Sequence, residues 1–307
     1  MKGQENFKKT AALSLIIAFG MTPATGVLAD STGDASSDIT SEYTAEQSDA
    51  LEVMTFASVA DEPAANEPAA NESGADEFVI ENGVLKKYNG TAADVVIPSS
   101  VSKIGDAAFK GNDDIKTVTI PDSVKVIGND AFSGCRRLST VNFGNGLTEM
   151  GSSAFSGSGV TSIEIPSGLT SIPWGAFSNC KGLKSVSIPI TVSTICGYAF
   201  NGCSSLSEVS IAANGLKDIG DSAFSNCSSL ASISLPSSLV SMGGFSFSNT
   251  NLQSITIPDS VTSISDFAFS GCRHLSTVNL GNGLKKLGKG AFTRSGITSV
   301  TIPGGVK

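Results

Sequence analysis

The chain has 307 residues, of which 33 are glycine and only one is histidine, and this scarcity of catalytic side chains argues against an enzyme. The net charge of −8 is local: residues 30–77 hold thirteen Asp or Glu and no Lys or Arg, whereas residues 78–307 hold fourteen acids and seventeen bases. Those bases are scattered and form no stripe interleaved with aromatics, so nucleic acid is excluded as the expected partner.

Residues 1–29 have the pattern of a cleaved secretory signal peptide. A basic start, "MKGQENFKK", precedes the apolar run "TAALSLIIAFGM", and small residues close the segment at "VLA". The apolar run is shorter than the ~20 residues that span a bilayer, so no transmembrane segment is expected. The sequence therefore predicts a protein that is secreted or held at the cell surface.

Residues 30–77 predict a disordered acidic spacer. The run "EPAANEPAANESGADE" combines Pro, Ala and acids, and it cannot bury enough apolar surface to offset the entropy of ordering. The pattern changes at Phe78, where "FVIENGVLKKY" places Asn82-Gly83 between two alternating apolar runs. This is a hairpin signal, and it predicts an N-terminal hairpin cap over 78–92.

A repeat of about 23 residues follows the hairpin. Each of nine units has a phenylalanine after a small residue, and successive phenylalanines are 22 to 24 residues apart. They are Phe109, Phe132, Phe155, Phe177, Phe200, Phe224, Phe247, Phe269 and Phe292.

Each unit also contains one short strand. In "TVTI", Val118 and Ile120 would point inward and Thr119 outward. One unit cannot bury its own apolar residues, but stacked units cover one another. The sequence therefore predicts a solenoid of about nine 22–24 residue units, with a parallel β-sheet on one face, little regular helix and a buried spine of phenylalanines.

The array contains a copied block. Residues 119–169 align with 256–306 at a constant offset of 137, with 32 identities in 51 positions. An offset of six units keeps every copied residue in register, so the recurrence is architectural.

The repeats resemble those of the BspA-type bacterial leucine-rich repeat family. One unit matches the general leucine-rich pattern at Leu206, Val209, Ile211, Asn214 and Leu216, and the shorter units read like "IPDSVKVIGNDAFSGCRRL". The resemblance covers 78–307 and implies a right-handed curved leucine-rich repeat solenoid. It also implies a secreted or surface protein that adheres to host proteins, host cells or other microbes, and it carries over no catalytic residue and no cofactor.

Five of the six cysteines occupy one position, three residues after the phenylalanine. A disulfide framework is the usual expectation for an exported protein. It fits poorly here, because two of the five have no cysteine on an adjoining unit and the other three form a run. Ligands 23 residues apart in a row do not converge on zinc either, so we expect small buried thiols and no metal site. The five are Cys135, Cys180, Cys203, Cys227 and Cys272.

Two surfaces are candidates for ligand binding. The outward strand positions form a Ser/Thr face without aromatics, which favours an ordinary soluble sheet face. A second set of residues lies near the position two before the spine phenylalanine, where most units have small or polar groups. This set forms an aromatic strip, interrupted at Ser222, that is either an exposed interaction site or extra core filling gaps between units. Its members are Trp174, Tyr198, Phe245 and Phe267.

These observations predict an exported, non-catalytic binding protein, an adhesin that recognises a host extracellular-matrix or cell-surface protein, or a microbial protein, through its repeats. The alternative is a structural spacer or scaffold arm that presents another domain or partner. The sequence stops in mid-unit at Lys307 without a polar cap, and such an open coil predicts self-association or a covering partner.

Overall fold

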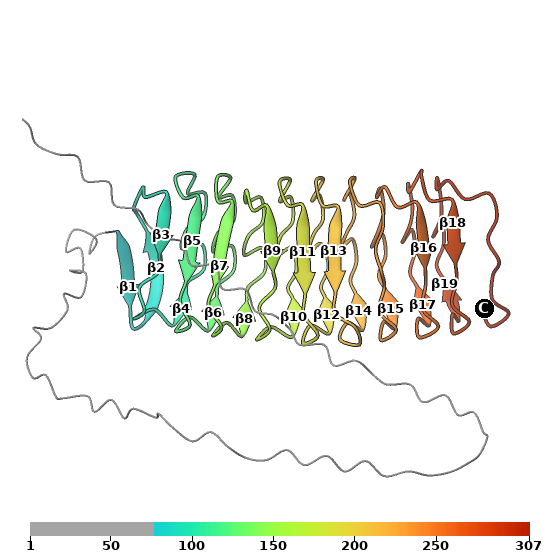
Figure 1. Cartoon of the computed structure of the whole chain (residues 1–307), viewed down its shortest axis with the longest axis horizontal. Coiled ribbons are helices and arrows are strands. Elements are labelled where there is room, and N and C mark those ends of the chain that lie inside the picture. Colours follow the sequence, from blue (N-terminus) through green and yellow to red (C-terminus); the bar gives the residue numbers. More distant parts are fainter. Residues whose placement is uncertain (1–76) are drawn as a thin grey trace, which may run out of the picture. The chain divides into compact units, whose positions relative to one another are not determined.

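The computed structural model describes residues 77–307. The predicted signal peptide over 1–29 and all but the last residue of the predicted acidic spacer lie outside the described residues. The described part belongs to one compact unit, in which successive coils stack along one axis (Figure 1). It contains strands and turns but no helix.

One face of the coils holds the longer strands, which pair in parallel with the equivalent strand of the next unit. The predicted parallel solenoid is therefore confirmed. The strands form three separate ladders: β3 (Asp94–Val96), β5 (Thr117–Ile120) and β7 (Thr140–Phe143); β9 (Ser162–Glu164), β11 (Ser185–Ile188) and β13 (Glu208–Ile211); and β16 (Ser254–Thr256) with β18 (Thr277–Asn279).

A second face holds two-residue strands, which the sequence analysis did not predict. They also pair in parallel and in register with the equivalent strand of the next unit, in two ladders that are separated between β8 and β10. They are β4 (Lys103–Ile104), β6 (Val126–Ile127), β8 (Glu149–Met150), β10 (Ser171–Ile172), β12 (Thr194–Ile195), β14 (Asp218–Ile219), β15 (Ser241–Met242), β17 (Ser263–Ile264) and β19 (Lys286–Leu287).

An antiparallel hairpin begins the described chain. It joins β1 (Phe78–Glu81) to β2 (Val84–Tyr88), and β2 pairs in parallel with β4. Asn82 and Gly83 form its turn with φ of 50° and 73°, the positive angles that a two-residue type I′ turn requires. The hairpin thus supplies the first strand of the short-strand face.

The core is organised around the phenylalanines, which stack face to face with ring centroids 4.7 to 5.5 Å apart. From Phe109 to Phe269 all eight are at most 1% exposed, and Phe292 of the last unit is half-buried. Tyr88 of the hairpin extends the stack at 5.0 Å from Phe109. The predicted buried spine is confirmed.

The five cysteines that share a position are buried, and all six cysteines are free thiols. Each buried Sγ donates to the carbonyl oxygen of the phenylalanine in the preceding unit, for example Cys135 to Phe109 and Cys203 to Phe177, both at 3.0 Å. A carbonyl has two lone pairs, so it accepts this bond besides a backbone N–H of its own unit, as Phe109 does from Asn112. The predicted buried thiols are therefore confirmed, with a polar partner that explains why a thiol suits this position.

The connection between the spine phenylalanine and the next strand has two lengths, and its length governs the strand ladder. Six residues separate Phe132 from Leu138, whereas five separate Phe155 from Val160, and the same short connection follows Phe247 and Phe292. A strand segment that follows a short connection does not join a ladder with the equivalent segment of the preceding unit. This holds for β9 and β7, for β16 and residues 231–235, and for residues 297–301 and β18. Removing one residue therefore shifts the strand out of hydrogen-bonding register with its neighbour.

Candidate binding surface

Two rows of left-handed backbone flank the phenylalanine spine on the turn side of each coil. The residues two before each phenylalanine have φ of 53° to 61°, and those two after it have φ of 57° to 75°. Two sharp reversals in every unit turn the chain around the spine ring. The first row is Ala107, Asp130, Ser153, Gly175, Tyr198, Ser222, Phe245, Phe267 and Gly290; the second is Gly111, Gly134, Gly157, Asn179, Gly202, Asn226, Asn249, Gly271 and Arg294.

Three members of the predicted aromatic strip occupy the first row. Left-handed backbone costs a residue with a Cβ roughly 1–2 kcal/mol, and a bulky residue there is a genuine outlier. Tyr198 and Phe245 are nevertheless 40% and 45% exposed, so core burial does not account for their presence. Exposed aromatic residues on strained backbone therefore support the hypothesis that this surface binds a ligand.

The four aromatic residues form two pairs. The rings of Trp174 and Tyr198 lie 4.8 Å apart, and those of Phe245 and Phe267 are stacked at 5.0 Å with an interplanar angle of 15°. Trp174 is 53% exposed, whereas Phe267 is half-buried. Of the two interpretations left open by the sequence, exposure favours a surface strip for three residues, and gap filling describes Phe267 better.

Glycines make room for the two outer rings. The indole of Trp174 lies against Gly197, and the ring of Phe267 lies against Gly290, so that a Cβ at either glycine would overlap a ring atom. Trp174 occupies the position at which Asn129 and Asp221 of other units accept from a backbone N–H of the next unit. Asp221, for example, accepts from the N–H of Gly244 at 2.7 Å. The local sequence is thus adapted to hold these rings.

A groove of about 480 Å³ runs along the solenoid beside the strip. Tyr198 and Phe245 form one wall with Ser222 between them, and the second left-handed row forms the other. Its floor is made by buried serines, including Ser225 and Ser248, which are 6% and 5% exposed. The interruption at Ser222 is visible in the sequence, but the groove into which it opens is visible only in the structure.

Asparagines and arginines complete the groove, and they were not among the predicted binding residues. The Nδ2 of Asn249 donates to the Oδ1 of Asn226 at 3.1 Å, and the Nδ2 of Asn226 donates to the Oγ of Ser225 at 3.2 Å. The Oδ1 of Asn249 and the second N–H of each amide are left to face a ligand. Arg273 and Arg294 line the far end. Their placement depends on the stacking of units, and no spacing in the sequence alone joins them to Tyr198.

The groove ends in a basic part of the chain. Residues 267–307 contain six Lys or Arg and no Asp or Glu. Within residues 77–307 the ion pairs are Lys110 with Asp130 and Arg136 with Asp113. The guanidinium groups of Arg273 and Arg294 therefore have no carboxylate partner in the described part of the chain.

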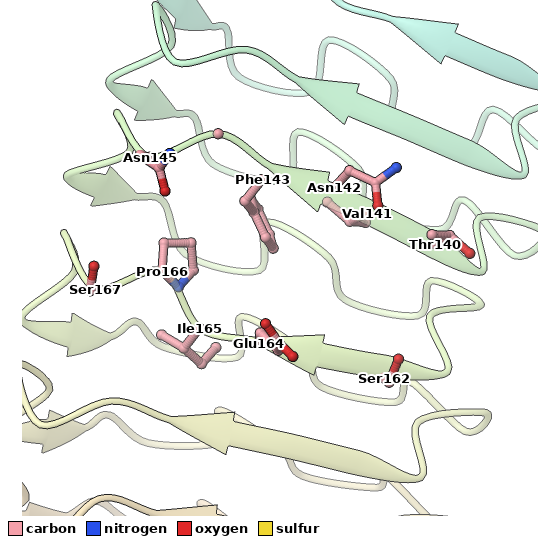
Figure 2. A pocket seen from close by; sticks show the side chains of 11 residues that line it. Thr140, Val141, Asn142, Phe143, Asn145, Ser162, Glu164, Ile165, Pro166 and Ser167 are labelled. Carbon is pink, nitrogen blue, oxygen red and sulfur yellow. The ribbon is translucent and has the colours of Figure 1, made fainter. Parts of the chain in front are cut away.

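The Ser/Thr face carries a second groove, of about 580 Å³, where β7 and β9 are unpaired. Figure 2 shows Phe143 and Pro166 in the space between the two strands. Phe143 packs edge-on against the spine ring of Phe155 at 5.9 Å, and Val141 and Phe143 are half-buried although the equivalent Val118 and Ile120 are buried. The remaining lining is mostly hydroxyl and amide groups with one carboxylate, Glu164. The one aromatic residue of this groove, Phe143, is packed against the spine, and no basic residue lines it.

The described residues contain no group of three or more His, Cys, Asp or Glu side chains placed to hold a metal ion. A helix long and apolar enough to cross a membrane is also absent from residues 77–307.

Comparison with known families identifies the repeat. The family described as "BspA type Leucine rich repeat region" matches six copies, over residues 80–207 and 193–307. No curated protein matches the sequence significantly.

Solved structures with similar folds are bacterial leucine-rich repeat proteins. One from Bacteroides ovatus is 28% identical, with 74% of this chain and 80% of that chain covered and a TM-score of 0.52. One from T. pallidum is 26% identical over 72% and 87% of the two chains, with a TM-score of 0.37. A leucine-rich cell surface protein of Faecalibacterium prausnitzii is 23% identical over 74% and 92%, with a TM-score of 0.33.

Proposed function

Since the chain belongs to the BspA-type leucine-rich repeat family, whose repeats commonly mediate protein binding, we propose that it is an exported, non-catalytic adhesin. It binds a protein of a host matrix, a host cell or another microbe. The contact surface is the aromatic strip of Trp174, Tyr198, Phe245 and Phe267.

The observation that carries the proposal is the strained, exposed aromatic row. Tyr198 and Phe245 have φ of 57° and 53° in the same row where Ser153 and Ser222 show that a small residue serves the turn equally well. Large aromatic side chains supply contact area at a low entropy cost and are enriched at the energetic centres of interfaces. On the polar strand face the aromatic residue that lines the groove, Phe143, is half-buried and packs against the spine ring of Phe155.

Export is part of the proposal and rests on the signal-like segment at 1–29 and the acidic segment at 30–77. The buried position of five thiols fits this location, because a thiol enclosed in the core is protected from oxidation.

The test is binding of the full chain to immobilised extracellular-matrix proteins, host cells and other microbes. The key variant combines Trp174→Ser, Tyr198→Ser, Phe245→Ser and Phe267→Ser, because serine occupies the equivalent positions of other units at Ser152, Ser153 and Ser222. We expect saturable binding to fall at least tenfold in this variant, with the circular dichroism spectrum unchanged.

A matched variant on the strand face serves as the control. Glu164→Gln combined with Ser185→Ala and Ser187→Ala changes polar side chains of β9 and β11, of which Glu164 and Ser187 are exposed and Ser185 is half-buried. This variant should leave binding unchanged. If only this variant loses binding, the contact surface is the strand face. If the wild-type chain binds no surface at all, the adhesin proposal is wrong and the scaffold alternative gains.

A further inference from the structure

The interruption of the aromatic strip has the dimensions of one missing ring. The spine rings of the units around Ser222 are 5.3 Å apart on either side, between Phe200, Phe224 and Phe247. Aromatic rings pack with centroids about 4.5–7 Å apart. Ser222 is itself 8% exposed and lines the groove together with Tyr198 and Phe245. A ring that enters over Ser222 from the groove would therefore stack against Tyr198 on one side and Phe245 on the other.

The groove beyond this notch has the chemistry of a peptide-binding channel. Buried serines line its floor, and Asn226 and Asn249 project along its side. Hydroxyl and amide groups can donate to and accept from a peptide backbone, and a few placed polar groups beside an apolar anchor are typical of binding sites.

The charged side chains of the groove favour a ligand that carries negative charge. Arg273 and Arg294 are exposed and lack carboxylate partners in the described residues. No acidic residue follows Asp266 in the sequence. Guanidinium groups bind carboxylates with strong, paired hydrogen bonds, so the far end of the groove is complementary to an acidic segment.

We infer that this groove binds an extended acidic peptide whose aromatic side chain inserts over Ser222, between Tyr198 and Phe245. The inference rests on the proposed function and specifies its ligand. In this inference the small side chain of Ser222 leaves the notch, the gap between Tyr198 and Phe245 that accepts the aromatic side chain. Arg273 and Arg294 bind the acidic end of the peptide.

The spacing of the units predicts the spacing within the peptide. Arg273 and Arg294 belong to the second and third units after that of Ser222, at spine steps of 5.3 to 5.5 Å. An extended chain advances about 3.3–3.6 Å per residue. The carboxylates should therefore lie roughly three and five residues from the aromatic side chain.

The probe is a fluorescein-labelled peptide, Gly-Ser-Phe-Gly-Ser-Glu-Gly-Glu-Ser-Gly, together with its reversed sequence, titrated into the full chain. Comparison peptides replace Phe by Ala or both Glu by Gln. We expect saturable binding of the first peptide in at least one chain direction, and at least tenfold weaker binding of either comparison peptide.

The decisive protein variant is Ser222→Phe. Phenylalanine already occupies the equivalent backbone at Phe245 and Phe267, so the fold should be kept while the notch is filled. Peptide affinity should fall at least tenfold. Arg273→Gln combined with Arg294→Gln should lower it severalfold and remove most of its salt dependence. The control is Arg136→Gln, because Arg136 is the counterpart of Arg273 in the copied block and lies outside the groove.

Unchanged affinity of Ser222→Phe, or equal binding of the Gln peptide, would overturn the inference. The inference would also be overturned if no peptide bound and a neutral hexasaccharide such as cellohexaose bound the wild-type chain but not Ser222→Phe. Adhesion to matrix or cells that survives Ser222→Phe, without peptide binding, would leave the proposed function standing and remove only this inference. Peptide binding without any adhesion would support this inference and contradict the proposed adhesive function.

Discussion

Two phenylalanines that are two residues apart have opposite roles in this protein. Phe247 is buried in the spine and stacks between Phe224 and Phe269, whereas Phe245 is 45% exposed on left-handed backbone. The same side chain therefore stabilises the fold at one position and provides surface at the other.

This contrast predicts different stabilities for two variants. Phe247→Ala should lower the free energy of unfolding by about 3–5 kcal/mol, because it removes a buried ring and leaves a cavity. Phe245→Gly should change it by less than about 1 kcal/mol, because relief of left-handed strain offsets the loss of a half-exposed ring. Urea unfolding followed by circular dichroism measures both, and equal losses would contradict the assignment.

The buried thiols predict how stability depends on pH. Burial raises the pKa of Cys135 and of Cys227 to about 12, and that of Cys180 to about 11, from an ordinary 9.0. In the unfolded chain these thiols lose their protons above about pH 9, whereas in the folded chain they keep them, so rising pH favours unfolding. Their contribution should be constant below pH 9 and fall between pH 9 and about 12.

Melting temperatures from pH 7.5 to 11 measure this decline. A variant with Cys135→Ala, Cys180→Ala and Cys227→Ala should start with a lower melting temperature and show a shallower decline above pH 9. An identical slope in the variant would mean that other groups cause the pH dependence.

The six thiols should also differ in reactivity. Cys196 is only half-buried, whereas the other five are enclosed in the core. A thiol reagent such as Ellman's reagent should therefore modify one thiol quickly in the native protein and the remaining five only on unfolding. Rapid modification of several thiols, or Cys196 reacting last as judged by mass spectrometry, would contradict the burial pattern.

At the scale of elements, one residue in the connection after the spine phenylalanine decides whether neighbouring strands pair. Long connections carry Cys at the third position, except for Asn112, and the short ones carry Ser158, Thr250 or Ser295. Where the connection is long, β5, β7, β11, β13 and β18 all join the preceding strand. Residues 231–235 are the exception, since they follow a long connection without forming a strand.

Lengthening a short connection should therefore close the gap between β7 and β9. Ser158→Cys with one residue inserted before Gly159 reproduces the long connection of other units. The N–H of Phe143 should then donate to the carbonyl oxygen of Glu164. The equivalent bond in a joined ladder runs from the N–H of Ile165 to the carbonyl oxygen of Ser187, at 2.9 Å. Amide hydrogen exchange should show new protection at Phe143, and an unchanged exchange rate would contradict this explanation of the gap.

At the scale of the whole molecule, much of the fold could be predicted because the repeat is nearly exact. The period of the phenylalanines and the alternation in segments such as Thr117–Ile120 determine the spine and the longer strands. The short-strand face was missed because two residues, as in β4 or β6, are too few to show an alternation. The first left-handed row was missed because Ala107, Asp130 or Ser153 gives no glycine signal for positive φ. The second row, in which glycine and asparagine predominate, does carry that signal in the sequence.

The candidate site could be predicted only in part. The aromatic residues stand out because they replace small residues in an aligned repeat, and so does the interruption at Ser222. Asn226, Asn249, Arg273 and Arg294 come from different units, and they meet along the groove only because stacking brings equivalent positions together. The exposure of each aromatic side chain and the contacts between rings also depend on neighbouring units. Neither can be predicted from the sequence of one unit alone.

We propose that the aromatic strip is the contact surface of an adhesive protein. Its most direct test is the ratio of dissociation constants, for the best-bound matrix or cell-surface protein, between the wild-type chain and the variant with serine at Trp174, Tyr198, Phe245 and Phe267. We expect a ratio of at least tenfold at equal melting temperatures. A ratio near one would place binding elsewhere on the solenoid and rule out the aromatic strip as the contact surface.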